Sequence, residues 1–182
     1  MRDFDYATAP PSLKLLVSAF LIAAVLGLGV AGLQVYVRTG MTAAGAVAHY
    51  RGDEAAMMYP RSFAEMVETT HAHVLAMPML ALILGLGLTL TRASERLKVA
   101  ATIALFAGVF LELLVPWLVR YGPPGAAHLL TVAGMSLSAG LLTCVAVPLY
   151  EMWAAGRPQM AGDRVQVAVP RVRQLPTSGT DS

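Results

Sequence analysis

This sequence has few charged residues and a single cysteine. Charged side chains make up 13% of its 182 residues, and the net charge is only +2. So small a net charge predicts no nucleic-acid partner. The lone Cys144 excludes an internal disulfide.

Motifs for common enzyme chemistry are also missing. The sequence has no Cys-x-x-Cys pair, no phosphate-binding glycine loop and no nucleophile placed beside a base. It therefore identifies no catalytic residues for hydrolase, nucleotide or disulfide chemistry, and it leaves enzymatic activity open.

Long apolar runs are present instead, because 57% of the residues are hydrophobic. Four segments exceed the roughly 18 to 20 residues that cross about 30 Å of hydrocarbon as a helix. They are Leu15–Val37, Val67–Thr91, Val99–Val119 and Gly125–Trp153. The sequence therefore predicts an all-α fold, an integral membrane four-helix bundle, in contact with the lipid bilayer and located in the bacterial inner (cytoplasmic) membrane as a multi-pass protein.

Basic residues predict how this bundle is oriented. With the N-terminus inside, nine of the 13 Lys and Arg residues lie on the side of both termini, and four lie on the other. Because basic loops favour the cytoplasm, we predict an N-in/C-in topology. Residues 1–153 form the predicted four-span domain, and residues 154–182, rich in Gly, Pro, Arg, Ser and Thr, form a predicted flexible cytoplasmic tail.

The connections between spans are unequal in length. Two are short, which predicts antiparallel hairpins of spans two and three and of spans three and four. One long outer loop, about Arg38–Arg61, has room for a short helix around Thr42–Tyr50 that would cover the outer face. Span two should begin near Phe63, since Ser62 and Glu65 have capping-box spacing.

Proline and glycine modify the first two spans. Pro78 removes a backbone hydrogen bond inside span two and should kink that helix. Small residues without a Cβ allow helices to approach closely in a membrane. The glycines expected to do so are Gly27, Gly29, Gly32, Gly85 and Gly87.

All four histidines fall on the predicted outer side, near Glu112, the only carboxylate that we predict inside the hydrocarbon. Ionisable groups are costly in a bilayer and mark functional sites. Residues two apart on a helix point about 200° apart, so His71 and His73 face opposite sides of span two. His71 shares a face with Glu68, whereas His73 shares one with Met77. The remaining histidines are His49, in the long loop, and His128, at the start of span four.

Imidazoles from different helices in the outer third of a bilayer fit a b-type haem, whose iron takes two axial nitrogens. His73 and His128 are the preferred pair, and His71 is almost as good a choice as His73. Arg120 or Arg61 would pair with the haem propionates, and Glu112 would lie close by.

The sequence also resembles a known group of proteins through several motifs. These are Tyr50-Arg-Gly-Asp-Glu54, Tyr59-Pro-Arg-Ser-Phe-Ala-Glu65, Thr70-His-Ala-His73 with Met77-Pro78, and Pro116-Trp-Leu-Val-Arg-Tyr-Gly122. They resemble an uncharacterised family of small bacterial four-span membrane proteins, over most of residues 38–153. The general layout is also similar to that of four-helix membrane cytochromes b. Those cytochromes carry histidines near both membrane faces, so this chain would hold at most one haem.

Three functional hypotheses follow. The leading one is an electron-transfer subunit with a single haem b, passing electrons between the quinone pool and a periplasmic partner such as a c-type cytochrome. The main alternative is a copper- or zinc-binding protein or transporter. Its ligands would come from His49, His71, His73, His128 and Glu68, with Met57 or Met77. The third is a noncatalytic accessory subunit of a larger membrane complex.

Overall fold

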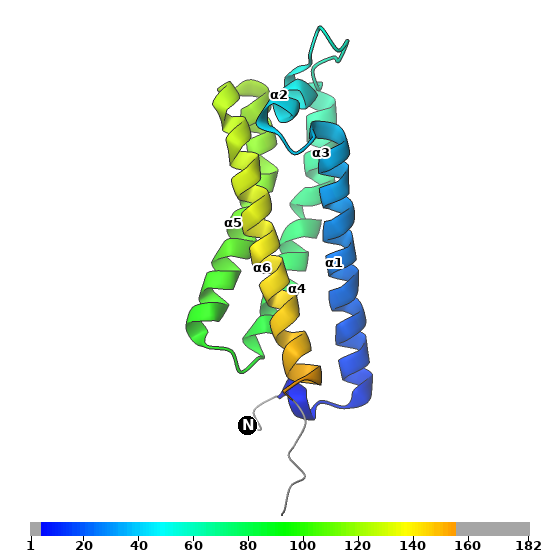
Figure 1. Ribbon diagram of the computed structural model, residues 1–182, viewed down its shortest axis with the longest axis vertical. Coiled ribbons are helices and arrows are strands. Elements are labelled where there is room, and N and C mark those ends of the chain that lie inside the picture. Colours follow the sequence, from blue (N-terminus) through cyan, green and yellow to red (C-terminus); the bar gives the residue numbers. More distant parts are fainter. Residues whose placement is uncertain (1–4, 156–182) are drawn as a thin grey trace, which may run out of the picture.

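The computed structural model describes residues 5–155 and consists of helices arranged as a bundle (Figure 1). The elements are η1 (Tyr6–Thr8), α1 (Pro11–Thr39), α2 (Ala43–Arg51), α3 (Phe63–Val74), α4 (Ala76–Thr89), α5 (Glu95–Tyr121), η2 (Pro124–Ala127) and α6 (His128–Trp153). Four helical segments are long and apolar enough to cross a membrane: Pro11–Thr39, Phe63–Thr89, Glu95–Tyr121 and Pro124–Trp153. The predicted four-span helical bundle is confirmed.

Two parts of the sequence-based prediction are not tested by this structure. The orientation of the bundle across a membrane stays a prediction, since the arrangement of the helices does not show which end faces the cytoplasm. The predicted tail, residues 154–182, lies outside the described residues from position 156 onward.

The second span is interrupted, as Pro78 predicted. Helix α3 ends at Val74 and α4 begins at Ala76, with Leu75 between them at φ −103°. Pro78 has no N–H to donate to the Val74 carbonyl, and its ring crowds that carbonyl, so the regular hydrogen-bond ladder stops there. The break changes the direction of the chain just below the histidines.

Helices α5 and α6 pack most tightly, at two glycines. A Cβ added to Gly108 would lie 2.4 Å from the Leu137 backbone nitrogen, and one added to Gly140 would lie 2.4 Å from that of Leu105. The backbones therefore meet where only glycine fits. The prediction for the other glycines was wrong. A Cβ on Gly27, Gly29, Gly32 or Gly85 would meet nothing within 4 Å, and one on Gly87 would meet only the Tyr6 hydroxyl, at 3.6 Å.

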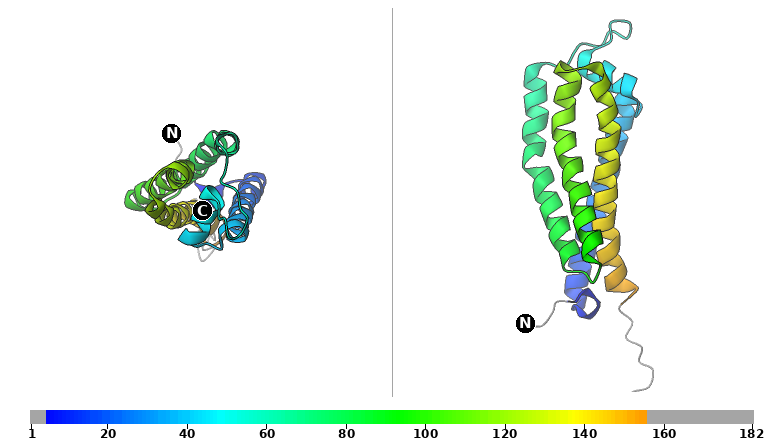
Figure 2. Two further views of the ribbon diagram at one scale, coloured as in Figure 1. Left: turned by 90° about the horizontal axis from the view of Figure 1, so that it is seen from above. Right: turned by 90° about the vertical axis from the view of Figure 1, so that its left-hand side faces the viewer.

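Helix α1 stands apart from much of the bundle (Figures 1 and 2). It contacts α6 near its first turns, through Lys14 and Ser18, and α2 near its last, but makes few contacts with α3 and α4. The side of α1 that faces α3 and α4 is therefore loosely packed. This is where the interior of the bundle opens.

Helix α2 lies across one end of the bundle, where the sequence predicted a short covering helix (Figure 2, seen from above). Thr42 caps its start by accepting from the Gly45 N–H at 3.0 Å. At its other end, Arg51 donates to the backbone carbonyls of Val119 and Gly122, which terminate α5. These bonds satisfy carbonyls that a helix end leaves unpaired, and they fix α2 over the bundle.

The opposite end is closed by contacts of the first described residues with α4 and with the end of α6. The Tyr6 hydroxyl donates to the Gly87 carbonyl at 3.2 Å, and Lys14 donates to the Met152 carbonyl at 3.0 Å. The indole N–H of Trp153 donates to Ser18 Oγ at 3.0 Å. The bundle therefore has a polar closure at each end and an apolar middle.

Candidate functional site

A cavity of about 410 Å³ lies between the four spanning segments. Its walls are apolar and come from all of them, including Ala23, Gly27 and Ala31 of α1, Met77, Leu80 and Leu84 of α4, Leu105 and Val109 of α5, and Leu137 and Leu141 of α6. His73 is the only titratable side chain in the lining. Such a cavity suits a largely apolar ligand that makes one strong polar contact.

The His73 ring is held in a defined orientation. Its Nδ1 lies 2.7 Å from the Thr69 carbonyl oxygen, one turn back on α3. A carbonyl only accepts, so Nδ1 carries a proton, and in the neutral imidazole Nε2 is then the atom with the free lone pair. Histidines that bind metals usually donate their other ring N–H to a carbonyl or carboxylate in this way. The Nε2 atom of His73 is therefore available to coordinate a metal centre or to accept a hydrogen bond from a ligand in the cavity.

Glu112 lies at the rim of the same cavity. It comes one turn after the lining residue Val109 on α5, and its Oε1 lies 3.9 Å from where a Cβ on Gly134 would be. Its carboxyl is within electrostatic range of His73 and of Tyr50. Among the described residues it has no hydrogen-bond partner. A carboxyl group thus lies beside the one imidazole of the cavity.

Tyr50, on α2, is the neighbour of Glu112 at this rim, and His49 precedes it in the same helix. Burial, followed by the negative charge of Glu112, raises the pKa of the Tyr50 hydroxyl, so Tyr50 stays a proton donor. Burial and the positive charges of Arg61 and Arg38 lower the pKa of His49 below its usual 6.5. The His49 ring, which contacts the Tyr50 ring edge-on at 4.9 Å between centroids, is therefore neutral at physiological pH.

The neutral state of His49 predicts a loss of stability in acid. The unfolded imidazole binds a proton as pH falls through about 6.5, before the buried one does, so stability should decrease from that pH down to the lower folded pKa. We expect the thermal midpoint of the wild type to fall between about pH 7.5 and about pH 5. His49→Gln should remove much of this fall, whereas His128→Gln, at an exposed position, should not. An unchanged pH profile in His49→Gln would contradict the burial of a neutral ring.

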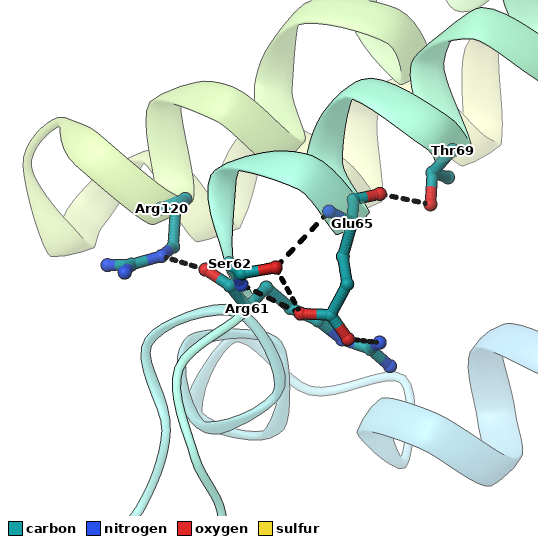
Figure 3. Close-up of polar contacts among 5 residues, drawn as sticks. All are labelled: Arg61, Ser62, Glu65, Thr69 and Arg120. Carbon is teal, nitrogen blue, oxygen red and sulfur yellow. Dashed lines mark hydrogen bonds and ion pairs between the residues drawn. The ribbon is translucent and has the colours of Figure 1, made fainter.

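A polar cluster fixes the start of α3, two turns or more before His73 (Figure 3). Ser62 Oγ accepts from the Glu65 N–H, and Glu65 accepts from the Ser62 N–H at 2.7 Å, which confirms the predicted capping box. Arg61 pairs with Glu65 at 2.9 Å, and Arg120 of α5 donates to the Arg61 carbonyl at 2.7 Å. The cluster ties α3 to the end of α5.

Aromatic side chains also hold α3 against α5. The indole N–H of Trp117 donates to Thr70 Oγ1 at 2.8 Å, and its ring meets that of Phe63 at 5.6 Å between centroids. Arg120, one of the two arginines predicted to pair with haem propionates, stacks on Tyr121 at 4.9 Å and donates to the backbone carbonyl of the other, Arg61. The structure thus gives Arg120 a role in positioning α3.

The other predicted site residues do not line the cavity. His71 and Glu68 are exposed on α3, and His128 is exposed at the first residue of α6. Within residues 5–155, no three His, Cys, Asp or Glu side chains form a group able to hold a metal ion. His71 and His73 do separate as their spacing predicted, since only His73 faces the cavity.

Comparison with known proteins gives the family. Residues 40–159, about two thirds of the chain, match the Aq_1264_TM family, which is described as a transmembrane helical domain. The chain belongs to this family. No curated protein and no solved structure matches it significantly. The matched range contains the last three of the four spans, and membership in Aq_1264_TM agrees with a multi-pass membrane protein.

Two polar residues of this Aq_1264_TM domain were missed by reasoning from the sequence. Tyr50 was assigned only to a covering helix, although its place in that helix puts it over Glu112. The burial of Glu151 on α6, which is only 8% exposed, was not predicted either. A Glu at the end of a long apolar run, before Trp153, was the available signal.

Proposed function

We propose that this protein is a membrane electron-transfer protein that holds one b-type haem in the four-helix cavity, with His73 as an axial ligand. The observation that carries the proposal is the His73 ring, whose Nδ1 is fixed on the Thr69 carbonyl while the side chain lines an otherwise apolar cavity. A haem supplies one-electron transfer, and its protein supplies an axial imidazole, apolar walls and a polar edge.

The residues present fit these requirements. The walls are apolar, and α1, which contributes small residues to them, makes few contacts with α4. Glu112 and Tyr50 provide the polar edge at the end nearest α2. A second axial ligand from His128 stays a prediction, because that residue is not in the lining. Electron exchange with quinone and with a periplasmic c-type cytochrome belongs to the same proposal.

The test is the visible spectrum of the full-length protein, purified in detergent from cells that make ample haem. We expect a haem spectrum in the wild type and its loss in His73→Ala. His71→Ala is the matched control, because His71 is two residues away on the same helix and, unlike His73, outside the lining. His128→Ala should keep the haem but lose a sharp reduced α-band if His128 is the second ligand. A colourless wild type that binds no added haem would overturn the proposal.

A second candidate occupant is a quinol, and a specific observation favours it. Glu112 has no hydrogen-bond partner among the described residues, and it lies near His73 at the rim of an apolar cavity. A quinol hydroxyl needs such acceptors, and its apolar tail could leave between α1 and α4. A colourless protein that binds a quinone analogue, and loses the analogue in Glu112→Gln, would select this candidate.

A further inference from the structure

A second groove lies at the end of the bundle opposite α2, far from the His73 cavity. It has a volume of about 470 Å³, is open to the outside, and is lined by Arg92, Ala93, Ala146, Val147, Tyr150 and Glu151. We propose that this groove binds a phospholipid with a primary ammonium headgroup, of the phosphatidylethanolamine class. The ammonium would contact Glu151, the phosphate would contact Arg92, and an acyl chain would follow α6.

The Glu151 carboxyl is the reason to expect an ammonium. Its side chain belongs to a residue only 8% exposed. Oε1 accepts from the Arg92 backbone N–H at 2.7 Å, but Oε2 is buried with no hydrogen-bond partner among the described residues. A buried carboxylate oxygen without a donor is costly, and a charged N–H donor is the strongest partner for it. A primary ammonium supplies that donor.

Arg92 provides the complementary charge. Its side chain is 68% exposed, although it pairs with Asp5, so its guanidinium can still donate to a phosphate. Its backbone N–H already holds Glu151, which keeps the positive and negative groups side by side. The ethanolamine headgroup has the same two charges, ammonium and phosphate, two carbons apart. The order of charges in the groove therefore complements that of the lipid.

The depth of the groove fits a lipid headgroup. Tyr150 and Trp153 are exposed aromatic residues at this end of α6, as in the aromatic belts found at membrane interfaces. Ala146 and Val147, one turn toward the middle of the helix, give an apolar wall where an acyl chain would begin. A water-soluble amine has no acyl chain to contact this apolar wall.

The first experiment uses the wild-type protein and changes only the lipid. Full-length protein in detergent would be given equimolar phosphatidylethanolamine, its N-monomethyl and N-dimethyl forms, phosphatidylcholine and phosphatidylglycerol with the same acyl chains. Native mass spectrometry would then count the retained lipids. We expect about tenfold more phosphatidylethanolamine than phosphatidylcholine, because the choline group has the same charge but no N–H. Retention should fall stepwise with methylation.

Two variants then locate the site. Glu151→Gln should bring phosphatidylethanolamine and phosphatidylcholine to near parity, whereas Glu95→Gln, an exposed acid near the same end, should leave the preference intact. Arg92→Ala keeps the backbone donor to Glu151 and should weaken both phosphatidylethanolamine and phosphatidylglycerol. Equal retention of all five lipids by the wild type would overturn the proposal, as would an unchanged preference in Glu151→Gln.

Discussion

Gly108→Ala should destabilise the protein by about 3 kcal/mol, the upper part of the range for overpacking a tight contact. The added methyl would lie 2.4 Å from the Leu137 backbone nitrogen, and a backbone cannot move aside as a side chain can. Helices α5 and α6 would have to separate. Equilibrium unfolding of the detergent-solubilised protein, monitored by helical circular dichroism, measures the loss.

Gly29→Ala is the matched control for this change. A Cβ there meets nothing within 4 Å, so the substitution should alter stability by no more than about 1 kcal/mol, in the stabilising direction, since alanine is the better helix former. Gly140→Ala should resemble Gly108→Ala. The double variant should cost less than the sum, because one separation of the helices relieves both clashes. A Gly108→Ala protein as stable as the wild type would mean that the helices cross at a wider spacing.

Glu112→Gln should uncouple electron transfer from protonation, if the haem proposal holds. Glu112 lies within electrostatic range of His73 at the cavity rim, and charges in a low-dielectric interior interact strongly. Reduction of the iron would then draw a proton to the carboxyl, giving a midpoint potential that falls by up to about 59 mV per pH unit. The amide keeps the shape but cannot ionise, so this slope should largely disappear. Potentiometric titration at several pH values measures it.

Glu68→Gln is the control for the Glu112 experiment. Glu68 is exposed on α3 and outside the cavity lining, so its loss should leave the pH dependence of the potential unchanged. If both variants retain the wild-type slope and the wild-type stability, Glu112 has a structural role only. The site would then consist of His73 and the apolar walls.

Features that depend on a few neighbouring residues could be read from the sequence alone. The four spans follow from run length, the start of α3 from the Ser62 and Glu65 cap, and the break after Val74 from Pro78. The covering helix α2 follows from the length of its loop. Helical spacing also separated His71 from His73, because their relative angle is a property of one helix.

Which side of each helix faces the interior was decided only by the tertiary structure. In water a helix shows its buried side by an apolar stripe. In lipid the outward side is as apolar as the inward one, so that stripe disappears. Gly29 and Gly108 therefore look alike in the sequence. In the structure no other helix contacts Gly29 on α1, whereas the backbone of α6 packs directly against Gly108 on α5. The choice of His73 over His71, the place of Tyr50 above Glu112 and the burial of Glu151 all depend on how four helices rotate against one another, and no single helix contains that information.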